Sequence, residues 1–203
     1  MHPNRKFHLT GRDEMAALAA DIGFGAVIVA AADGLRAVHV PFLLDGDRVR
    51  FHVSRGNSAW PALAEGGEAL LLVEGPHAYI SPDWYGLEGR VPTWNYVALE
   101  LAGPVRALDR AALVALVDGL SAANEARLAP KPAWTKARMD GARYEALLNA
   151  IAGFELHVTA WRGTAKLDQD KPPEVRARLA AALSARGEAA MADAMVPDAK
   201  ETA

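Results

Sequence analysis

The sequence predicts a mainly β protein, an antiparallel barrel with peripheral helices. Four short apolar runs follow one another closely, at 24–32, 35–44, 48–54 and 69–73. The first three are separated by Asp33-Gly34 and by Asp45-Gly46-Asp47, which are strong turn signals. A parallel α/β sheet would need helices alternating with strands, and these four runs lack them.

Helical patterns and two further strands complete the predicted barrel. Apolar residues recur at helical spacing in 15–22, and Asp109 and Asp140 are suited to cap two later helices. Pro172-Pro173 opens a last helix, with Val175, Leu179 and Leu183 on one face and Gly187 at its end. The predicted later strands span 93–106 and 153–159. The inward residues expected for the two capped helices are Leu113, Leu116, Val117, Leu120 and Ala123, and Tyr144, Leu147, Leu148 and Ile151.

Length and composition indicate a single soluble domain. The 203 residues carry a net charge of −3 and no cysteine, which excludes disulfides and thiolate chemistry. No apolar run is long enough to span a bilayer, and residues 1–7 lack a signal-peptide core, so a cytoplasmic location is expected. We expect one domain over 1–187 and a flexible tail over 188–203, which shows no packing signal.

One segment is unusually rich in aromatic residues. Gly75 to Tyr85 reads Gly-Pro-His-Ala-Tyr-Ile-Ser-Pro-Asp-Trp-Tyr, and Val91 to Tyr96 reads Val-Pro-Thr-Trp-Asn-Tyr. Proline and glycine among the rings suggest a rigid loop that presents flat faces. Such a loop could plug the core beneath a barrel mouth or form a wall for a planar ligand, and the residues alone favour neither.

A second segment has the chemistry of an anion-binding turn. The predicted strand 48–54 ends in Ser54-Arg55-Gly56-Asn57. Arg55 can donate two hydrogen bonds to a phosphate, Ser54 can donate one, and Gly56 permits close approach of backbone N–H groups. An isolated Ser-Arg-Gly is nonetheless more often a turn with a solvated arginine.

A third segment, Lys166-Leu167-Asp168-Gln169-Asp170-Lys171, is read from its residues alone as a solvated, charged turn. His39, His77 and His157 lack metal-ligand spacing, so each is read as a core or rim histidine and no metal is expected. The sequence contains no dinucleotide-binding, Walker or nucleophile-elbow motif.

These segments, in this order, resemble the PaiB-like family of FMN-binding negative transcriptional regulators. The family reads His-Val-Ala-Arg-Ala-Asn-Pro where this chain has His-Val-Ser-Arg-Gly-Asn-Ser at 52–58. The aromatic segments at 75–85 and 91–96 match the family pattern, as does Ile-x-Gly-Phe-Glu at 151–155. The resemblance covers about residues 7–183.

The resemblance implies an FMN-binding split β-barrel with flanking helices, related to pyridoxamine 5'-phosphate oxidase. It also implies a homodimer with FMN at the subunit interface. Ser54, Arg55 and Asn57 would then hold the phosphate, and Trp94 and Asn95 would lie beside the ring or the ribityl chain. The remaining implied residues form the pocket wall or close the site: Tyr79, Ser81, Trp84, Lys166 and Gln169.

The chain departs from the family at two charged positions. The family signature Lys-Leu-Ser-Gln-Asn is Lys-Leu-Asp-Gln-Asp here, which places Asp168 and Asp170 where neutral residues are typical. Near a flavin phosphate these carboxylates would weaken binding by about 1–3 kcal/mol, whereas pointing to solvent they would change little. Ser58 replaces a proline, which loosens the turn modestly.

Three functions are compatible with these residues. The first is a flavin-binding negative transcriptional regulator, although no helix-turn-helix pattern is evident and the net charge is negative. Arg176, Arg178 and Arg186 form a candidate basic surface, for which a solvated helix face is the more common explanation. The second is a flavin-dependent oxidoreductase, in which the cofactor carries the chemistry, with haem binding as a lower-ranked variant. The third is a cofactor-free ligand-binding or structural descendant of the barrel. A DNA or protein partner has no support from charge or motif.

Overall fold

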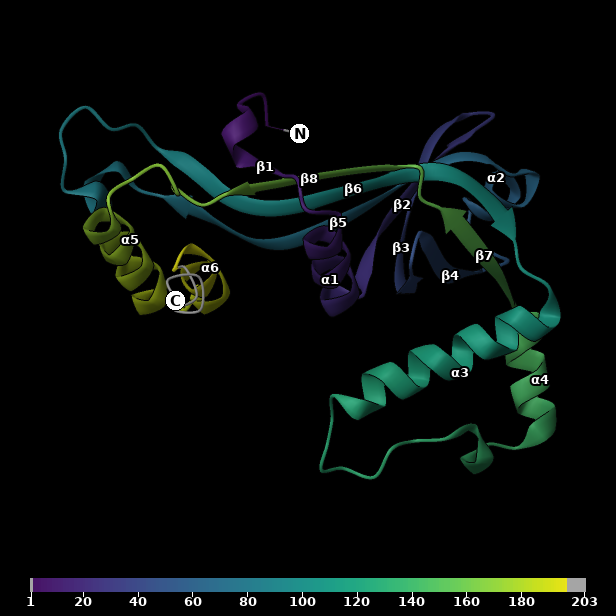
Figure 1. Ribbon diagram of the computed structural model, residues 1–203. Coiled ribbons are helices and arrows are strands. Elements are labelled where there is room, and N and C mark those ends of the chain that lie inside the picture. The colour runs from purple at the N-terminus through teal and green to yellow at the C-terminus, as the bar shows by residue number, and fades with distance from the viewer. Residues whose placement is uncertain (1, 197–203) are drawn as a thin grey trace. The chain divides into compact units, whose positions relative to one another are not determined.

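The computed structural model describes residues 2–196 (Figure 1). Contacts within the chain group its residues into two compact units. We call Arg12–Val73 with Glu100–Trp161 the barrel unit, and Met1–Gly11, Glu74–Leu99 and Arg162–Ala203 the terminal unit. The single domain predicted over 1–187 stays a prediction. Within residues 2–196, no helix is long and apolar enough to cross a membrane.

The barrel unit is built on a closed antiparallel sheet. Its strands follow the order β6-β5-β2-β3-β4-β7, and β7 pairs in turn with β6, so that the sheet closes on itself. The strands are β2 (Phe24–Ala31), β3 (Gly34–Asp45), β4 (Arg48–Ser54), β7 (Ile151–His157) and parts of β5 (Gly67–Ile80) and β6 (Thr93–Ala107). This arrangement confirms the antiparallel barrel predicted from the sequence.

Two tight hairpins set the register of the first three strands. Ala31 pairs with Gly34 across the first turn, and Asp45 pairs with Arg48 across the second. Gly46 takes a φ of 59°, a backbone conformation that glycine adopts at little cost. Both turns therefore form where the sequence predicts them.

Alternating side chains fill the barrel interior. In β4, Val49, Phe51 and Val53 are buried while their neighbours are half-buried or exposed. Phe51 pairs with Phe154 of β7, and the two rings stack with centroids 5.8 Å apart. A Cβ added at Gly103 would lie 2.0 Å from the His157 carbonyl oxygen, so the backbones of β6 and β7 approach too closely there for any side chain.

Four α-helices accompany this sheet: α1 (Arg12–Ile22), α2 (Trp60–Glu65), α3 (Arg110–Ala126) and α4 (Gly141–Asn149). Asp109 and Asp140 cap α3 and α4 as predicted, because each carboxylate accepts a hydrogen bond from a backbone N–H in the first turn. The sequence analysis missed the short helix α2. Leu147 and Ala123, both expected to point inward, are exposed, Leu147 by 52%.

The terminal unit combines four strand segments with two packed helices. Its sheet order is β1-β8-β6-β5, with β1 (His8–Leu9) and β8 (Ala160–Lys166), and a 3-10 helix η1 (Arg5–Phe7) precedes β1. Another 3-10 helix, η2 (Pro82–Tyr85), follows β5. The helices are α5 (Pro173–Ala185) and α6 (Ala189–Met195), which lie side by side in Figure 1.

Two expectations for this unit are wrong. Residues 75–80 are not a loop but the end of β5, since the strand alternation continues there and buries Ala78 and Ile80. The segment from 189 to 195 is not an unpacked tail but α6. Met191 and Met195 are fully buried against Leu179 and Leu183 of α5. Residues 197–203 of the expected tail lie outside the described residues.

Candidate functional site

The predicted phosphate turn lies in the barrel unit, directly after β4. The backbone N–H of Arg55 donates to the Ala150 carbonyl at 2.9 Å, which fixes the turn to the end of α4. The Ser54 hydroxyl accepts from the Gly56 N–H at 3.2 Å, and the Asn57 side chain accepts from the Ala59 N–H at 2.9 Å. Ser54 and Asn57 therefore shape the turn through their acceptor atoms.

Arg55 is the group in this turn that is ready to hold an anion. Its Nε donates to the Asn149 carbonyl at 3.1 Å, and its guanidinium lies 5.6 Å from the centre of the Trp60 ring. In residues 2–196 its two terminal nitrogens have no hydrogen-bond partner, and the residue is exposed. A guanidinium oriented in this way presents its paired N–H donors to a ligand, which suits a phosphate.

A second arginine beside Arg55 was missed by the sequence analysis. Arg110, the first residue of α3, donates to the Asn149 side chain at 2.6 Å and forms an ion pair with Glu145. Arg55 and Arg110 both line a cavity of about 200 Å³. Arg55 bonds to the backbone of Asn149 and Arg110 to its side chain, so tertiary packing brings the two arginines together and sequence spacing carried no signal for Arg110.

Exposed rings gather in the terminal unit, on β5 and β6. The Trp94 ring lies 6.2 Å from that of Tyr79, edge to face, and 6.3 Å from that of His77. Trp94 is 55% exposed and Tyr79 45%. These three residues, here called the aromatic cluster, border a hollow of about 330 Å³ that Arg186 also lines. His77, read from the sequence as a core or rim residue, belongs to this surface.

Two predicted wall residues have mainly structural contacts. Trp84 is half-buried and packs against the α5–α6 core, with the Arg186 guanidinium 6.0 Å from its ring centre. Ser81 precedes η2, and its carbonyl accepts the Trp84 N–H at 3.2 Å. Both residues therefore help to set the turn after β5.

The charged segment after β8 is not a solvated turn at Asp168. This residue is 6% exposed and has a φ of 54°. Its carboxylate accepts hydrogen bonds from the Tyr85 hydroxyl, at 3.0 and 3.1 Å, and from the Asn95 amide at 2.8 Å. Burial, followed by the negative charge of Asp168, raises the pKa of Tyr85. Asn95 is fully buried in this network, so its amide nitrogen serves Asp168 rather than an external ligand.

Asp170, Lys166 and Gln169 fasten the same segment. Asp170 forms ion pairs with Lys6 at 2.7 Å and with Lys171 at 2.9 Å, and the Lys6 hydrogen bond is the main cause that lowers the pKa of Asp170 to about 2. Lys166 donates to the Thr93 hydroxyl and to the Trp94 carbonyl, each at 2.6 Å, and burial lowers its pKa. The Gln169 side chain accepts a hydrogen bond from the backbone N–H of residue 167 and donates one to the carbonyl of residue 165. Both acidic side chains are thus engaged within the terminal unit.

The closed barrel, continued by β8 and accompanied by helices, is a split β-barrel. A family model described as "Putative FMN-binding domain" matches residues 1–160, and the chain belongs to that family. It is 27% identical over 175 residues to "Protease synthase and sporulation protein PAI 2" of Bacillus subtilis strain 168, covering 84% of this chain and 83% of that protein.

Solved structures agree on the fold. The "FAD and Heme binding protein" of Mycobacterium smegmatis has a TM-score of 0.55 and 21% identity, covering 79% of this chain and 73% of that one. The "Flavocytochrome Anf3" of Azotobacter vinelandii has a TM-score of 0.56 and 18% identity, with 81% and 72% covered. The family supports a flavin cofactor. The residues fit one, because Arg55 offers unused donors and Asp168 is turned into the interior.

Proposed function

We propose that this protein is a flavin-binding negative transcriptional regulator of the PaiB type, cytoplasmic and homodimeric. Its family and its likeness to the PAI 2 protein along most of both chains support this proposal. The flavin is the element through which the regulator would sense its surroundings, because a bound flavin can change its oxidation state.

The observation that carries the proposal is the orientation of Arg55. Its Nε is already bonded to Asn149, while its terminal nitrogens are left for a ligand. A phosphate there would receive a charge-assisted, bidentate contact, with Ser54 and Asn57 holding the turn in shape. Arg110 would add positive charge at the same cavity, reduced by its ion pair with Glu145.

Within the terminal unit, the aromatic cluster is a second candidate surface for a planar ligand. Trp94 and Tyr79 are too exposed to be core residues, and their faces suit a flat heterocycle. The hollow beside them also carries Arg186, a donor for polar ring atoms. Lys166 fixes the Trp94 backbone, and Gln169 fixes the segment that follows Lys166, so both act here as positioning residues.

A fluorescence titration tests the Arg55 assignment. FMN should bind the wild-type chain saturably, and Arg55→Ala should bind it about 100-fold more weakly, which corresponds to about 2.7 kcal/mol for two charge-assisted hydrogen bonds. Arg55→Lys keeps the charge but not the paired donors and should lose about tenfold. Arg143→Ala, an exposed arginine of α4 outside the turn, should match the wild type. Equal affinity of Arg55→Ala and the wild type would refute the assignment.

The arginines of α5 bear on how such a regulator would act. The Arg176 guanidinium donates to the Met195 carbonyl, and that of Arg178 donates to the Tyr85 carbonyl. Because these arginines hold α6 and η2 in place, they are poorly suited to a DNA-binding surface. We therefore propose action through a protein partner. Retardation of the DNA upstream of its own coding sequence, but not of a scrambled fragment, would contradict this.

Homodimerisation has its own test. Sedimentation equilibrium of the FMN-loaded protein should give twice the 21.6 kDa of one chain. A mass that stays at 21.6 kDa at all concentrations would refute the dimer.

A further inference from the structure

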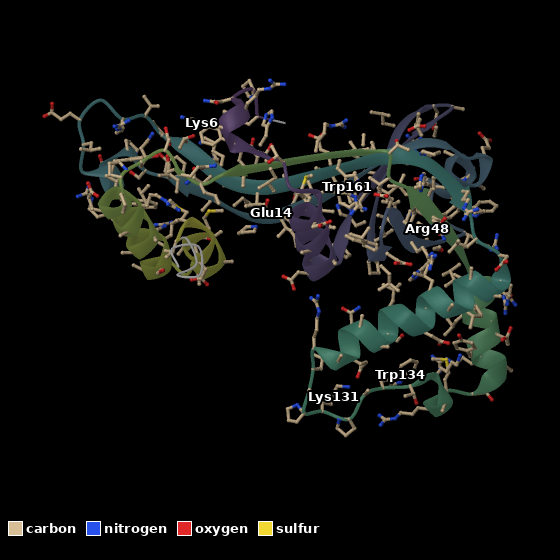
Figure 2. All side chains as sticks on the ribbon, viewed as in Figure 1. Lys6, Glu14, Arg48, Lys131, Trp134 and Trp161 are labelled. Atoms are coloured by element: carbon tan, nitrogen blue, oxygen red, sulfur yellow. The ribbon has the colours of Figure 1, made fainter. Side chains whose placement is uncertain are left out.

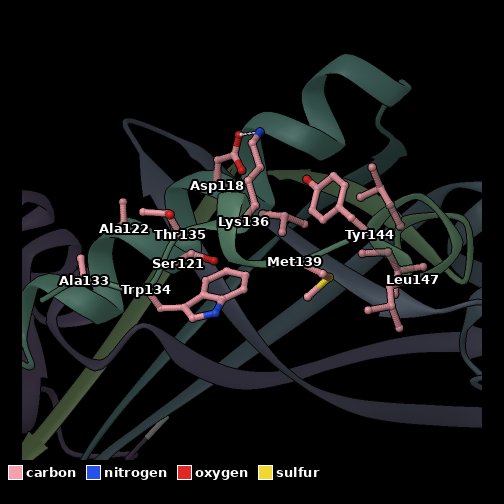
Figure 3. Close-up of a pocket in the computed structure, with 13 residues that line it drawn as sticks. Asp118, Ser121, Ala122, Ala133, Trp134, Thr135, Lys136, Met139, Tyr144 and Leu147 are labelled. Carbon is pink, nitrogen blue, oxygen red and sulfur yellow. Dashed lines mark hydrogen bonds and ion pairs between the residues drawn. The ribbon is translucent and has the colours of Figure 1, made fainter. Parts of the chain in front are cut away.

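The barrel unit contains a larger cavity that none of the ten predicted flavin residues lines. It measures about 530 Å³ and lies among α3, α4 and the chain that links them (Figure 3). Val117 and Ser121 of α3 form one side, Trp134 and Met139 of the linking chain form another, and Tyr144 and Leu147 of α4 line a third. Its volume falls within the range of small-molecule pockets.

The walls of this cavity are mostly apolar and include two aromatic rings. Trp134 and Tyr144 offer ring faces and edges, and Met139 adds a polarisable thioether between them (Figure 3). Leu147 is 52% exposed although it lines the cavity. A concave apolar surface left open in this way favours an apolar occupant.

The linking chain is held in place without any occupant. The Trp134 backbone N–H donates to the Glu125 carboxylate at 2.7 Å, and the Lys131 ammonium pairs with the same carboxylate. Figure 2 shows Lys131 and Trp134 along this link. Lys136 forms an ion pair with Asp118 of α3 at 2.6 Å. The cavity is therefore preformed, which spares a ligand the entropic cost of ordering the chain.

The polar groups around the cavity favour an uncharged ligand. The Tyr144 hydroxyl is covered by protein atoms, so a ligand in the cavity contacts the Tyr144 ring and not its hydroxyl. Asp118 and Lys136 neutralise one another at the edge of the cavity, so no free charge is available to attract an ion.

We propose that this cavity binds an uncharged, largely aromatic small molecule. Two rings and a thioether provide the apolar contacts. Occupancy would tie α3 to α4. The site is separate from the flavin residues, so it gives the protein a second ligand.

N-phenyl-1-naphthylamine is a suitable probe, because it is neutral and aromatic and its emission rises in an apolar site. Titrated into the full-length, FMN-loaded protein, it should show a saturable, blue-shifted rise in emission with one molecule per chain. Ala122→Phe, which fills the cavity from an exposed position on α3, should weaken binding at least tenfold. Tyr144→Phe keeps the ring and should bind the probe within twofold of the wild type.

Ala123→Phe is the matched control, since Ala123 is exposed on the same helix and does not line the cavity. It should bind the probe within twofold of the wild type, and all three variants should bind FMN normally. Absence of saturable binding, or equal binding by the Ala122 and Ala123 variants, would overturn the proposal. Displacement of the probe by FMN would identify the cavity as the flavin site and also overturn it. A wild type that binds no probe, with an Ala122→Phe variant that dissociates to monomers, would assign the cavity to a second copy instead.

Discussion

Replacing Asp168 by alanine should destabilise the protein substantially. The change removes the acceptor of the Tyr85 hydroxyl and of the Asn95 amide, both in a buried position. Two unpaired buried donors cost about 4 kcal/mol together, at about 2 kcal/mol each. Alanine tolerates the φ of 54° less well than aspartate, which adds about 1 kcal/mol. Removing the carboxylate also removes the cost of burying its charge, which offsets about 2 kcal/mol. We therefore expect the free energy of unfolding to fall by about 3 kcal/mol in total.

Urea denaturation and thermal unfolding followed by circular dichroism at pH 7 would measure this loss. For a chain of this length, about 3 kcal/mol corresponds to a Tm lowered by roughly 6–12 °C. Asp168→Asn keeps one acceptor oxygen and tolerates the backbone conformation, so it should lose only about 1 kcal/mol. Asp83→Ala, an exposed aspartate of η2, is the control and should stay within about 0.5 kcal/mol of the wild type.

A double-mutant cycle isolates the Tyr85–Asp168 contact. Tyr85→Phe and Asp168→Ala should show a coupling energy of about 1–2 kcal/mol, because each removes the same hydrogen bonds. A loss below about 0.5 kcal/mol for Asp168→Ala, or additivity of the two changes, would refute the idea that this buried network holds the segment after β8.

Three further perturbations test other parts of the account. Burial and the Asp168 charge raise the pKa of Tyr85 above its ordinary value of 10.0. The stability that the protonated hydroxyl contributes should therefore be intact below pH 10.0 and be lost as the pH rises beyond that value. Tyr85→Phe should flatten this alkaline loss of stability, and a variant with the same pH profile as the wild type would contradict the expectation. Glu155→Gln should lower the free energy of unfolding, measured by urea denaturation, by about 2 kcal/mol. The reason is that the buried Glu155 carboxylate accepts hydrogen bonds from Arg50 and Arg106, which joins three strands. A loss no larger than that caused by Glu145→Gln, at an exposed position, would contradict this expectation. Met195→Ala should lower the free energy of unfolding by about 2–4 kcal/mol, since the Met195 side chain is fully buried. A variant as stable as the wild type would mean that α6 does not pack against α5.

The barrel could be predicted because its signals are local. Alternation in 48–54, the Asp33-Gly34 turn and the caps at Asp109 and Asp140 depend on neighbouring residues, and the structure contains all four features. The end of β5 and helix α6 depend on partners distant in sequence. Residues 75–80 resemble a loop until β6 pairs with them, and 189–195 show no signal until Met191 and Met195 meet α5.

The candidate site also contains some residues that local sequence could predict and others that it could not. Arg55 and its turn were visible as a short motif, and the structure gives Arg55 unused donors. Asp168 carried a misleading signal, because a charge in a Lys- and Asp-rich segment normally faces water, yet Tyr85 and Asn95 supply a buried pair of donors 83 and 73 residues away. Arg110 gave no sequence signal, since only the packing of α3 beside α4 determines its surroundings.

The most direct test of the central claim is the visible absorption spectrum of the purified protein, followed by a titration with FMN. The account predicts the absorption bands of oxidised flavin, or saturable quenching of FMN fluorescence with one flavin per chain, and about 100-fold weaker FMN binding by Arg55→Ala. A colourless protein that leaves FMN fluorescence unchanged would contradict flavin binding and leave this barrel as a scaffold for another ligand.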